Sequence, residues 1–256
     1  MTIGQFLLID STLKYNGLVL YARAHSEDLG CYARSAKPWT SKWFKPLRGE
    51  VVVDCGSSVG FFTLLGLANG ASVYAFEANP GTFNVLKRNI DINGFEKAAH
   101  LYNVALSDTD GTVTLYVPND FTGSASLRRD WTKCYPRGDA IAALQIPATS
   151  LDHALADLKT IDWLLIDVEG VEDALLRGAL NLIKRTKRVI IEISHEKSTG
   201  VREQLIQHGF SESSRGTPEE KVQYLFFTRV GASKSDSEDV GRMLNSQTSR
   251  SEAKSQ

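Results

Sequence analysis

From residue 51 to residue 228 the chain alternates between two patterns of apolar positions. Some segments are short and continuously apolar, as buried strands are, and others space their apolar residues three or four apart, as one-sided helices do. The strand-like segments are residues 51–54, 72–77, 100–104, 162–167, 188–194 and 222–228. Because strands and helices alternate, the pattern predicts an α/β fold with a doubly wound, mainly parallel sheet that helices cover on both faces.

The helix-like segments lie between these strands. One ends near Ala68, and the next spans residues 79–94, opened by an Asn-Pro pair and closed by an Asn-Gly pair. Both pairs are typical of helix ends. Two further helices are expected, one running continuously through residues 175–182 and one that closes at Gly209.

Three segments fall outside this alternation. Residues 1–49 are expected to form a hairpin and cap, with strands at 6–9 and 18–22 on either side of an Asn-Gly turn. Residues 105–149 interrupt the main domain of residues 50–230 with a hairpin strand and an irregular loop, which either covers a substrate or is a surface excursion. Residues 231–256, rich in Ser, charged and amide side chains, are expected to be disordered.

Composition narrows the function mainly by exclusion. The chain has 256 residues and a net charge of −1, so it has no general attraction for nucleic acids or acidic membranes. Its three cysteines are far apart, which predicts neither a disulfide framework nor a zinc site. The first residues hold an apolar run of only four residues, too short for a signal peptide or a membrane span. A cytoplasmic protein is therefore expected.

Polar residues stand where the predicted strands end. Asp54, Glu77, Asn103, Asp167 and His195 each follow or close an apolar run. In sheets of this kind, ligands bind beyond the carboxyl ends of the strands, where the strand order reverses. The pattern therefore predicts one binding site built from these side chains.

The turn after the first central strand, Asp54-Cys-Gly56-Ser-Ser-Val-Gly60, indicates which ligand binds there. A dinucleotide site has a glycine directly after the strand, so that pyrophosphate can lie on the next helix. Here an acid holds that place, and a carboxylate repels pyrophosphate but attracts a sulfonium and an ammonium group. S-adenosylmethionine carries both cations and no phosphate. Gly56 is expected to let the backbone approach this cofactor, and Gly60 to let the helix pack closely on the strand.

Residues after the next two strands fit the remainder of the same cofactor. Glu77 lies 77 − 54 = 23 residues beyond Asp54, close to the interval of about 20 residues at which an acid meets ribose hydroxyls. Its two oxygens can accept both hydroxyl protons. Asn103 and the Val104 backbone are expected to pair with the adenine edge, although Asn103 also has the simpler interpretation of a turn amide.

Five segments in order resemble the FkbM-type methyltransferases, a branch of the S-adenosylmethionine-dependent class I fold. They are VVVDCGSSVGFFTLL, VYAFEANPGTFNVLKRNI, NVALSDTDGTVTLYV, TSLDHAL and IDWLLIDVEGVEDALLRGA. The resemblance implies methyl transfer, mostly to hydroxyl oxygens of natural products, sugars and lipid-linked glycans. It also implies an active-site position for Asp167 and Glu169. Together, residues and resemblance give this expected cofactor-binding set: Asp54, Gly56, Ser57, Gly60, Glu77, Ala78, Asn103, Val104 and Asp167.

The chain departs from the family pattern at three places. Ser58 stands where an asparagine is usual, and Leu165 stands where a lysine commonly precedes the acid by two residues. His195 follows one residue later than the family's usual histidine. These departures motivate one alternative, a cofactor-binding module without catalysis.

Two residues compete for the role of general base. In-line methyl transfer needs the acceptor held in line with the methyl group, and a base that takes the hydroxyl proton adds to the rate. His195 has the more suitable intrinsic pKa, so it is predicted as the base, with Asp167 orienting the acceptor or the cofactor amine. A divalent cation held by Asp167, Glu169 and Glu172 is a less favoured alternative, and no metal is predicted.

The sequence therefore predicts an S-adenosylmethionine-dependent O-methyltransferase acting on a small molecule or glycan. An RNA methyltransferase is the alternative among enzymes, because the 105–149 segment carries four cations: Arg128, Arg129, Lys133 and Arg137. The overall charge disfavours that alternative, since RNA binding rests on phosphate contacts.

Overall fold

A computed structural model of the chain describes residues 9–36, 38–118, 122–131, 141–194, 198–215 and 222–231. The predictions for His195, Lys133 and Arg137 lie outside these residues, as does the predicted disorder of the tail beyond residue 231. Every helix in the described part of the chain is too short or too polar to cross a membrane.

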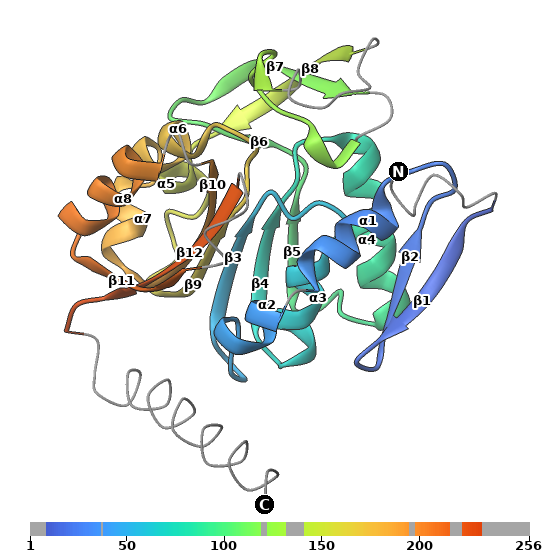
Figure 1. The fold of residues 1–256 in the computed structure, drawn as a ribbon, viewed down its shortest axis with the longest axis horizontal. Helices are drawn as coiled ribbons and strands as arrows, with labels where there is room; N and C mark the ends of the chain where they lie inside the picture. Colours follow the sequence, from blue (N-terminus) through green and yellow to red (C-terminus); the bar gives the residue numbers. More distant parts are fainter. Residues whose placement is uncertain are drawn as a thin grey trace, which may run out of the picture.

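A seven-stranded sheet forms the centre of the molecule (Figure 1). In spatial order it contains β11 (Phe210–Arg215), β12 (Val222–Arg229), β10 (Thr186–Ser194), β9 (Ile161–Ile166), β3 (Val51–Cys55), β4 (Ser72–Phe76) and β5 (Ala99–Tyr102). The strands from β10 to β5 pair in parallel, and β12 is antiparallel to both of its neighbours. The predicted doubly wound, mainly parallel α/β fold is confirmed.

Helices cover both faces of this sheet because successive strand residues point to opposite sides. Val52 belongs to one buried cluster, with Leu64 and Leu86, while Val53 belongs to another, with Leu176. The helices are α1 (Asp28–Ser35), α2 (Pro38–Trp43), α3 (Phe61–Ala68), α4 (Pro80–Asn93), α5 (Leu151–Ala154), α6 (Glu172–Arg177), α7 (Leu180–Lys184) and α8 (Ser198–Gln207). The limits predicted for α4 are confirmed: Asn79 caps its start and Gly94, in a left-handed conformation, ends it.

The helix expected to run through residues 175–182 is instead two helices, α6 and α7. Gly178 follows α6, and a Cβ atom there would lie 2.2 Å from the carbonyl oxygen of Ser107. The chain therefore approaches the segment after β6 too closely for any other residue at this point. The apolar spacing continued across the break, which is why the prediction of one helix was wrong.

The N-terminal hairpin consists of β1 (Ser11–Tyr15) and β2 (Leu18–Ala22). The second strand was predicted correctly, but the strand paired with it is residues 11–15; residues 6–8 of the predicted first strand lie outside the described residues. Asn16 and Gly17 both have positive φ, 49° and 83°, as a two-residue hairpin turn requires, and this turn pairs Tyr15 directly with Leu18. The turn, rather than the nearest apolar run, fixes where the first strand lies.

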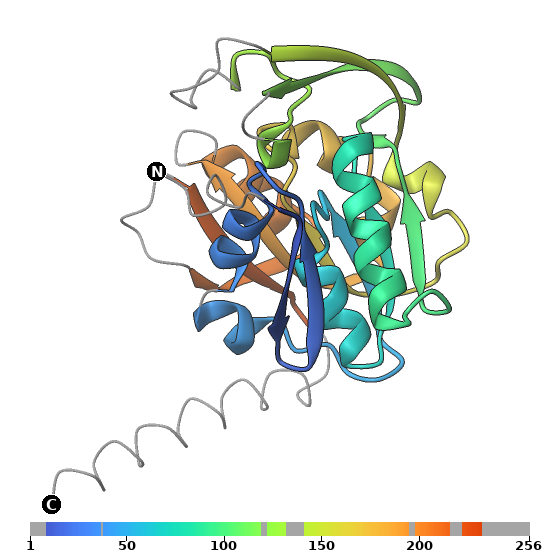
Figure 2. The same ribbon diagram turned by 90° about the vertical axis from the view of Figure 1, so that its right-hand side faces the viewer.

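The 105–149 segment forms a small sheet of its own, ordered β6 (Ala105–Leu106), β8 (Ile141–Thr149) and β7 (Gly111–Pro118). The hairpin strand β7 was expected, but β8 was not, since most of its side chains are exposed and give no clear alternation. Between them, residues 122–131 include the short helix η2 (Thr122–Ser124) and a bridge from Ser126 to Tyr116. Figures 1 and 2 show the small sheet at one end of the molecule, beyond the central strands.

Candidate active site

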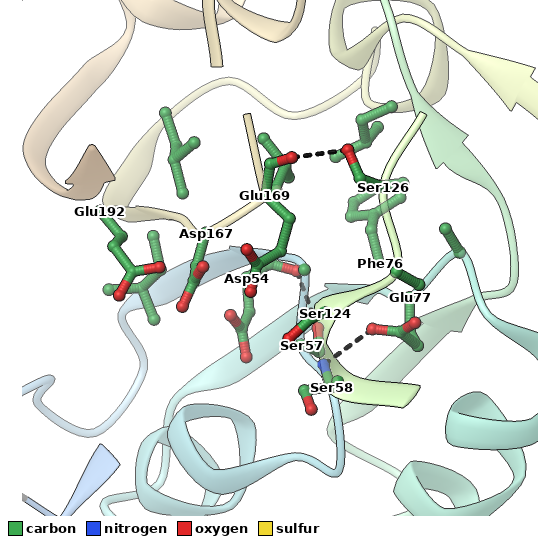
Figure 3. Close-up of a pocket in the computed structure, with 18 of the residues that line it drawn as sticks. Asp54, Ser57, Ser58, Phe76, Glu77, Ser124, Ser126, Asp167, Glu169 and Glu192 are labelled. Atoms are coloured by element: carbon green, nitrogen blue, oxygen red, sulfur yellow. Dashed lines mark hydrogen bonds between the residues drawn. The ribbon is translucent and has the colours of Figure 1, made fainter. Parts of the chain in front are cut away.

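A cavity of about 370 Å³ lies at the carboxyl ends of β3, β4, β9 and β10. Figure 3 shows residues of these strands and of the 122–131 segment around it. Most of the predicted site residues line it: Asp54, Gly56, Ser57, Glu77, Ala78, Val104, Asp167 and Glu169. Gly60 and Asn103 do not. The prediction that strand ends converge on one site therefore holds for most of these side chains.

Asp54 is buried at the tip of β3, with 3% of its surface exposed. The hydroxyl of Thr63, on α3, donates to its Oδ2 atom at 2.5 Å. Burial raises the pKa of Asp54 to about 6; the Thr63 hydrogen bond lowers it in part, and the nearby charge of Asp167 raises it again. The carboxyl group is thus held in place at the cavity wall and stabilised by any cation that enters.

The two glycines of the turn act through close packing. Gly56 has φ +82°, and a Cβ atom there would lie 1.8 Å from the carbonyl oxygen of Asp167, so β3 and the end of β9 meet at this residue. Gly60 has φ +95°, and its Cβ would lie 2.6 Å from Leu86 of α4. The expectation that Gly60 serves packing against the strand needs correction, because its close neighbour is a helix.

Glu77 follows β4 and is held by two backbone amides. Its Oε2 accepts from the Ser58 amide at 2.9 Å and its Oε1 from the Asn79 amide at 2.8 Å. Burial raises the pKa of Glu77 to about 7, although these two amide bonds favour the charged form. Since a carboxylate oxygen can accept more than one hydrogen bond, both oxygens keep capacity for a further donor.

Asn103 does not line the cavity but holds the loop that does. Its amide nitrogen donates to the carbonyl oxygens of Glu77 at 2.8 Å and Ala78 at 3.3 Å. Its donor side thus fixes the loop after β4, while Ala78 and Val104, also predicted to bind the cofactor, line the cavity.

The other wall of the cavity gathers three carboxyl groups, from Asp167, Glu169 and Glu192. One oxygen of each lies within 4.8 Å of the others, close enough for them to share a positive charge. The hydroxyl of Tyr224 donates to Oδ2 of Asp167 at 2.9 Å, and Tyr224 is the direct cross-strand partner of Glu192. Burial, then the charge of Asp167, raises the pKa of Glu192 well above its ordinary value.

Glu169 anchors the segment that covers the cavity. Its backbone has φ +52°, its Oε2 accepts from the indole nitrogen of Trp131 at 2.8 Å, and its carbonyl oxygen accepts from the Ser126 hydroxyl at 2.7 Å. Gly170 faces the Trp131 ring, which a Cβ there would meet at 2.7 Å. The 105–149 insertion, expected either to cover the site or to be a surface excursion, therefore contributes residues 123–127 to the cavity wall.

Two alternatives from the sequence can be compared with these positions. Glu172 is not part of the carboxyl group cluster, because its Oε1 accepts from the Gly170 amide at 2.7 Å, and Glu192 takes its place. The RNA alternative rests on four cations of the 105–149 segment. One of them, Arg128, forms an ion pair with Asp130, so its charge is balanced within the segment.

Sequence reasoning missed Glu192 and Tyr224. The available signal was a glutamate in the middle of the apolar run of β10, where a charge is costly unless it has a partner or a function.

The charged side chains that line the described part of the cavity are all acidic. Among the described residues that line it, Glu27, Asp54, Glu77, Asp167, Glu169 and Glu192 are acidic, and none is Lys, Arg or His. Leu165, at the position where the family commonly has a lysine, is one of the lining residues.

A model of the methyltransferase FkbM domain matches residues 54–212, more than half of the chain. The chain belongs to the FkbM methyltransferase family. Among the curated relatives of this FkbM domain, Methyltransferase 1 of Beauveria bassiana is 29% identical over 142 residues, 50% of this chain and 57% of that protein. Methyltransferase sdnD of Sordaria araneosa is 28% identical over 153 residues, 50% of this chain and 59% of that protein. The matches thus span less than two thirds of either relative's length.

Other similarities to the FkbM domain are shorter or more distant. A tRNA wybutosine-synthesizing protein 2 homolog of Danio rerio is 39% identical over 74 residues, 26% of this chain and 18% of that protein. Among solved structures, a precorrin-8w decarboxylase of Methanobacterium thermoautotrophicum has a TM-score of 0.45 and 19% identity, covering 72% of this chain and 84% of that one. TYW2 of P. horikoshii in complex with MeSAdo has a TM-score of 0.45 and 14% identity, and the match covers 85% of this chain and 69% of that one.

Proposed function

We propose that this FkbM domain transfers the methyl group of S-adenosylmethionine to a hydroxyl oxygen of a small molecule or glycan. The observation that carries the proposal is the acidic cavity, with the buried carboxyl of Asp54 at the tip of β3. A cavity of this charge disfavours phosphate-bearing dinucleotides and favours a cofactor with two cations and no phosphate.

The residues of the β3–β4 wall fit the parts of such a cofactor. Asp54 would attract its ammonium group, and the free acceptor capacity of Glu77 would receive two ribose hydroxyls. Ala78 and Val104 also line the cavity and would lie along the adenine ring. The cofactor supplies an activated methyl group on sulfur; the chain supplies the position and the charge.

The β9–β10 wall is left for the acceptor. Asp167 and Glu192 face the cavity there, and residues 123–127 cover it. Such a cover would hold the hydroxyl oxygen in line with the methyl group and exclude water that competes for it. His195, the base predicted from the sequence, follows β10 directly but lies outside the described residues, so its role stays a prediction.

Titration calorimetry tests the cofactor. We expect binding of S-adenosylmethionine and none of NAD, and we expect Asp54→Asn to weaken binding at least tenfold, about 1.4 kcal/mol, because it removes the charge at the strand tip. Glu203→Gln, on the exposed side of α8, is the matched control and should bind as the wild type does. Binding of NAD, or equal affinity in the Asp54 variant, would contradict the proposal.

A second assay tests the reaction. The protein is incubated with S-adenosylmethionine and a panel of polyols, phenols and oligosaccharides, and release of S-adenosylhomocysteine is measured. We expect acceptor-dependent release and a new methyl ether in the product. Methylation only of nitrogen atoms or of RNA would overturn the acceptor class while leaving the cofactor assignment in place.

A further inference from the structure

We propose that Asp167 and Glu192 act as one proton-sharing pair, completed by Tyr224, and that this pair takes the proton of the acceptor hydroxyl during methyl transfer. The inference rests on the proposed function and deepens it. It assigns the general base to two carboxyl groups on the acceptor side of the cavity.

The geometry of the pair comes from three neighbouring strands. Asp167 directly follows β9, and Glu192 lies on β10, which pairs with β9 up to the residues just before them, Ile166 and Ile191. Tyr224 lies opposite Glu192 on β12, and its hydroxyl reaches Oδ2 of Asp167 at 2.9 Å. The pair and the phenol all line the cavity, and Figure 3 shows both carboxyl groups turned toward it.

Charge explains why this pair holds a proton. Two ionised carboxylates in contact inside a cavity repel each other, so one of them keeps its proton. The groups that face Glu192 are Asp167 and Glu169 from the loop after β9 and Tyr224 from β12, and Asp54 on β3 adds its charge to that of Asp167. None of these described neighbours is a cation. Burial and Asp167 both raise the pKa of Glu192, in agreement with a shared proton.

The same charges give the pair its function once a sulfonium ion is present. A positive charge in the cavity lowers the proton affinity of the pair, which releases its proton to solvent. In the transfer, the hydroxyl oxygen forms a bond to the methyl carbon, and the carbon–sulfur bond breaks with its electron pair left on sulfur. The hydroxyl proton passes to the carboxyl pair. One positive charge is lost from sulfur and one proton is gained by the pair, so the net charge of the cavity is unchanged.

The experiment compares S-adenosylmethionine with S-adenosylhomocysteine by calorimetry in two buffers of different ionisation enthalpy, which gives the number of protons released on binding. The two ligands share the ammonium group and the ribose, so the protons that Asp54 and Glu77 release in response to those shared groups cancel in the difference. We expect S-adenosylmethionine to release about one proton more than S-adenosylhomocysteine near pH 7. Equal release for both ligands would overturn the inference while leaving cofactor binding intact.

Three variants and one control locate the proton. Glu192→Gln keeps the side-chain volume and should abolish the additional release, whereas Glu203→Gln should keep it. Tyr224→Phe removes a donor that stabilises the charged pair, so the pH at which the additional release is half complete should rise. His195→Ala should keep the additional release. Its loss in that variant, or its persistence in Glu192→Gln, would assign the proton elsewhere and overturn the pair.

Two further outcomes are informative. If a chelator removes the difference between the two ligands, a metal ion and not a proton occupies the pair, and the inference is wrong. If S-adenosylmethionine does not bind at all, the proposed function fails and the inference fails with it.

Discussion

The two walls of the cavity hold their acids in different ways. On the β3–β4 wall, the carboxyl groups of Asp54 and Glu77 accept hydrogen bonds from a hydroxyl and from two backbone amides. On the β9–β10 wall, Asp167 and Glu192 meet each other and the hydroxyl of Tyr224. One wall fixes its carboxyl groups with hydroxyl and backbone amide donors, and the other places carboxyl groups against each other.

This difference separates two tasks. Fixed donors orient a carboxylate in advance, which suits recognition of a cation and of hydroxyl groups. Acids in mutual contact exchange protons easily, because the charge of one changes the proton affinity of the other. The walls meet at Gly56, where the turn after β3 touches the end of β9. Changes on either wall, or at their boundary, should therefore have distinct effects.

The largest effect is expected from Gly56→Ala, at the boundary of the two walls. The new Cβ would lie 1.8 Å from the carbonyl oxygen of Asp167, and φ is +82°. Overpacking against backbone and a left-handed conformation together should cost about 3–4 kcal/mol of the free energy of unfolding. Urea denaturation measures this loss.

Gly17→Ala is the matched control for that substitution. Gly17 has nearly the same φ, +83°, but nothing lies within 4 Å of its Cβ position. It should lose only about 1 kcal/mol, the cost of the backbone conformation alone. Similar losses at both sites would show that the walls do not press together at Gly56.

An intermediate effect is expected from Asp54→Asn on the β3–β4 wall. The pKa of Asp54 rises from 3.8 to about 6, so between these pH values the folded protein binds more protons than the unfolded chain. Stability of the unliganded protein therefore falls as pH rises through this window, by about 2–3 kcal/mol from this group. Asparagine carries no such cost, so the variant should be more stable than wild type at pH 8 and not at pH 4.

Thermal unfolding across pH measures this change. Glu203→Gln is the control and should follow the wild-type curve, because Glu203 is exposed. A variant that binds S-adenosylmethionine weakly but is more stable at pH 8 would mark Asp54 as a binding group held at a cost in stability. A loss of stability at pH 8 would instead assign Asp54 a structural role.

The smallest effect is expected from Trp131→Phe, where the cover meets the β9–β10 wall. The substitution keeps a ring over Gly170 but removes the hydrogen bond from the indole nitrogen to Glu169. We expect a local loss of about 1 kcal/mol, measured as faster hydrogen exchange in residues 122–131, with little change in global stability.

Trp163→Phe is the control, since Trp163 also donates its indole nitrogen to a glutamate, Glu50, at 2.8 Å and is buried in the core. It should lower global stability, so hydrogen exchange in residues 122–131 should become faster only to the same extent as in the rest of the chain. If Trp131→Phe produced no local change, the Glu169 contact would not hold the cover.

Local signals predicted most of the central fold. The alternation of apolar segments identified the parallel strands and the limits of α4, because burial on both faces and helix caps leave marks within a few residues. The two errors have different causes. The break between α6 and α7 depends on a distant contact with Ser107, whereas the position of β1 depends on the register that the Asn16-Gly17 turn imposes, a local signal that the apolar run obscured.

The candidate site was predictable to the same degree. Asp54, Glu77 and Asp167 were found because strand ends face one edge of a parallel sheet, and the structure brings all three to one cavity. Glu192 and Tyr224 were missed because they lie inside strands, and their meeting depends on the pairing of β12 with β10. Asn103 was placed near the right loop, but only the structure shows its amide bonded to carbonyl groups there.

The sequence by itself determined where most of the central strands and helices lie along the chain and which acids stand at the strand tips, since periodicity and turn residues act over short stretches of chain. Only the tertiary structure decided which of those acids face each other, which residues cover them, and that a phenol completes the second wall. Those relations depend on strand order and register across the sheet, which arise from packing between residues far apart in the chain.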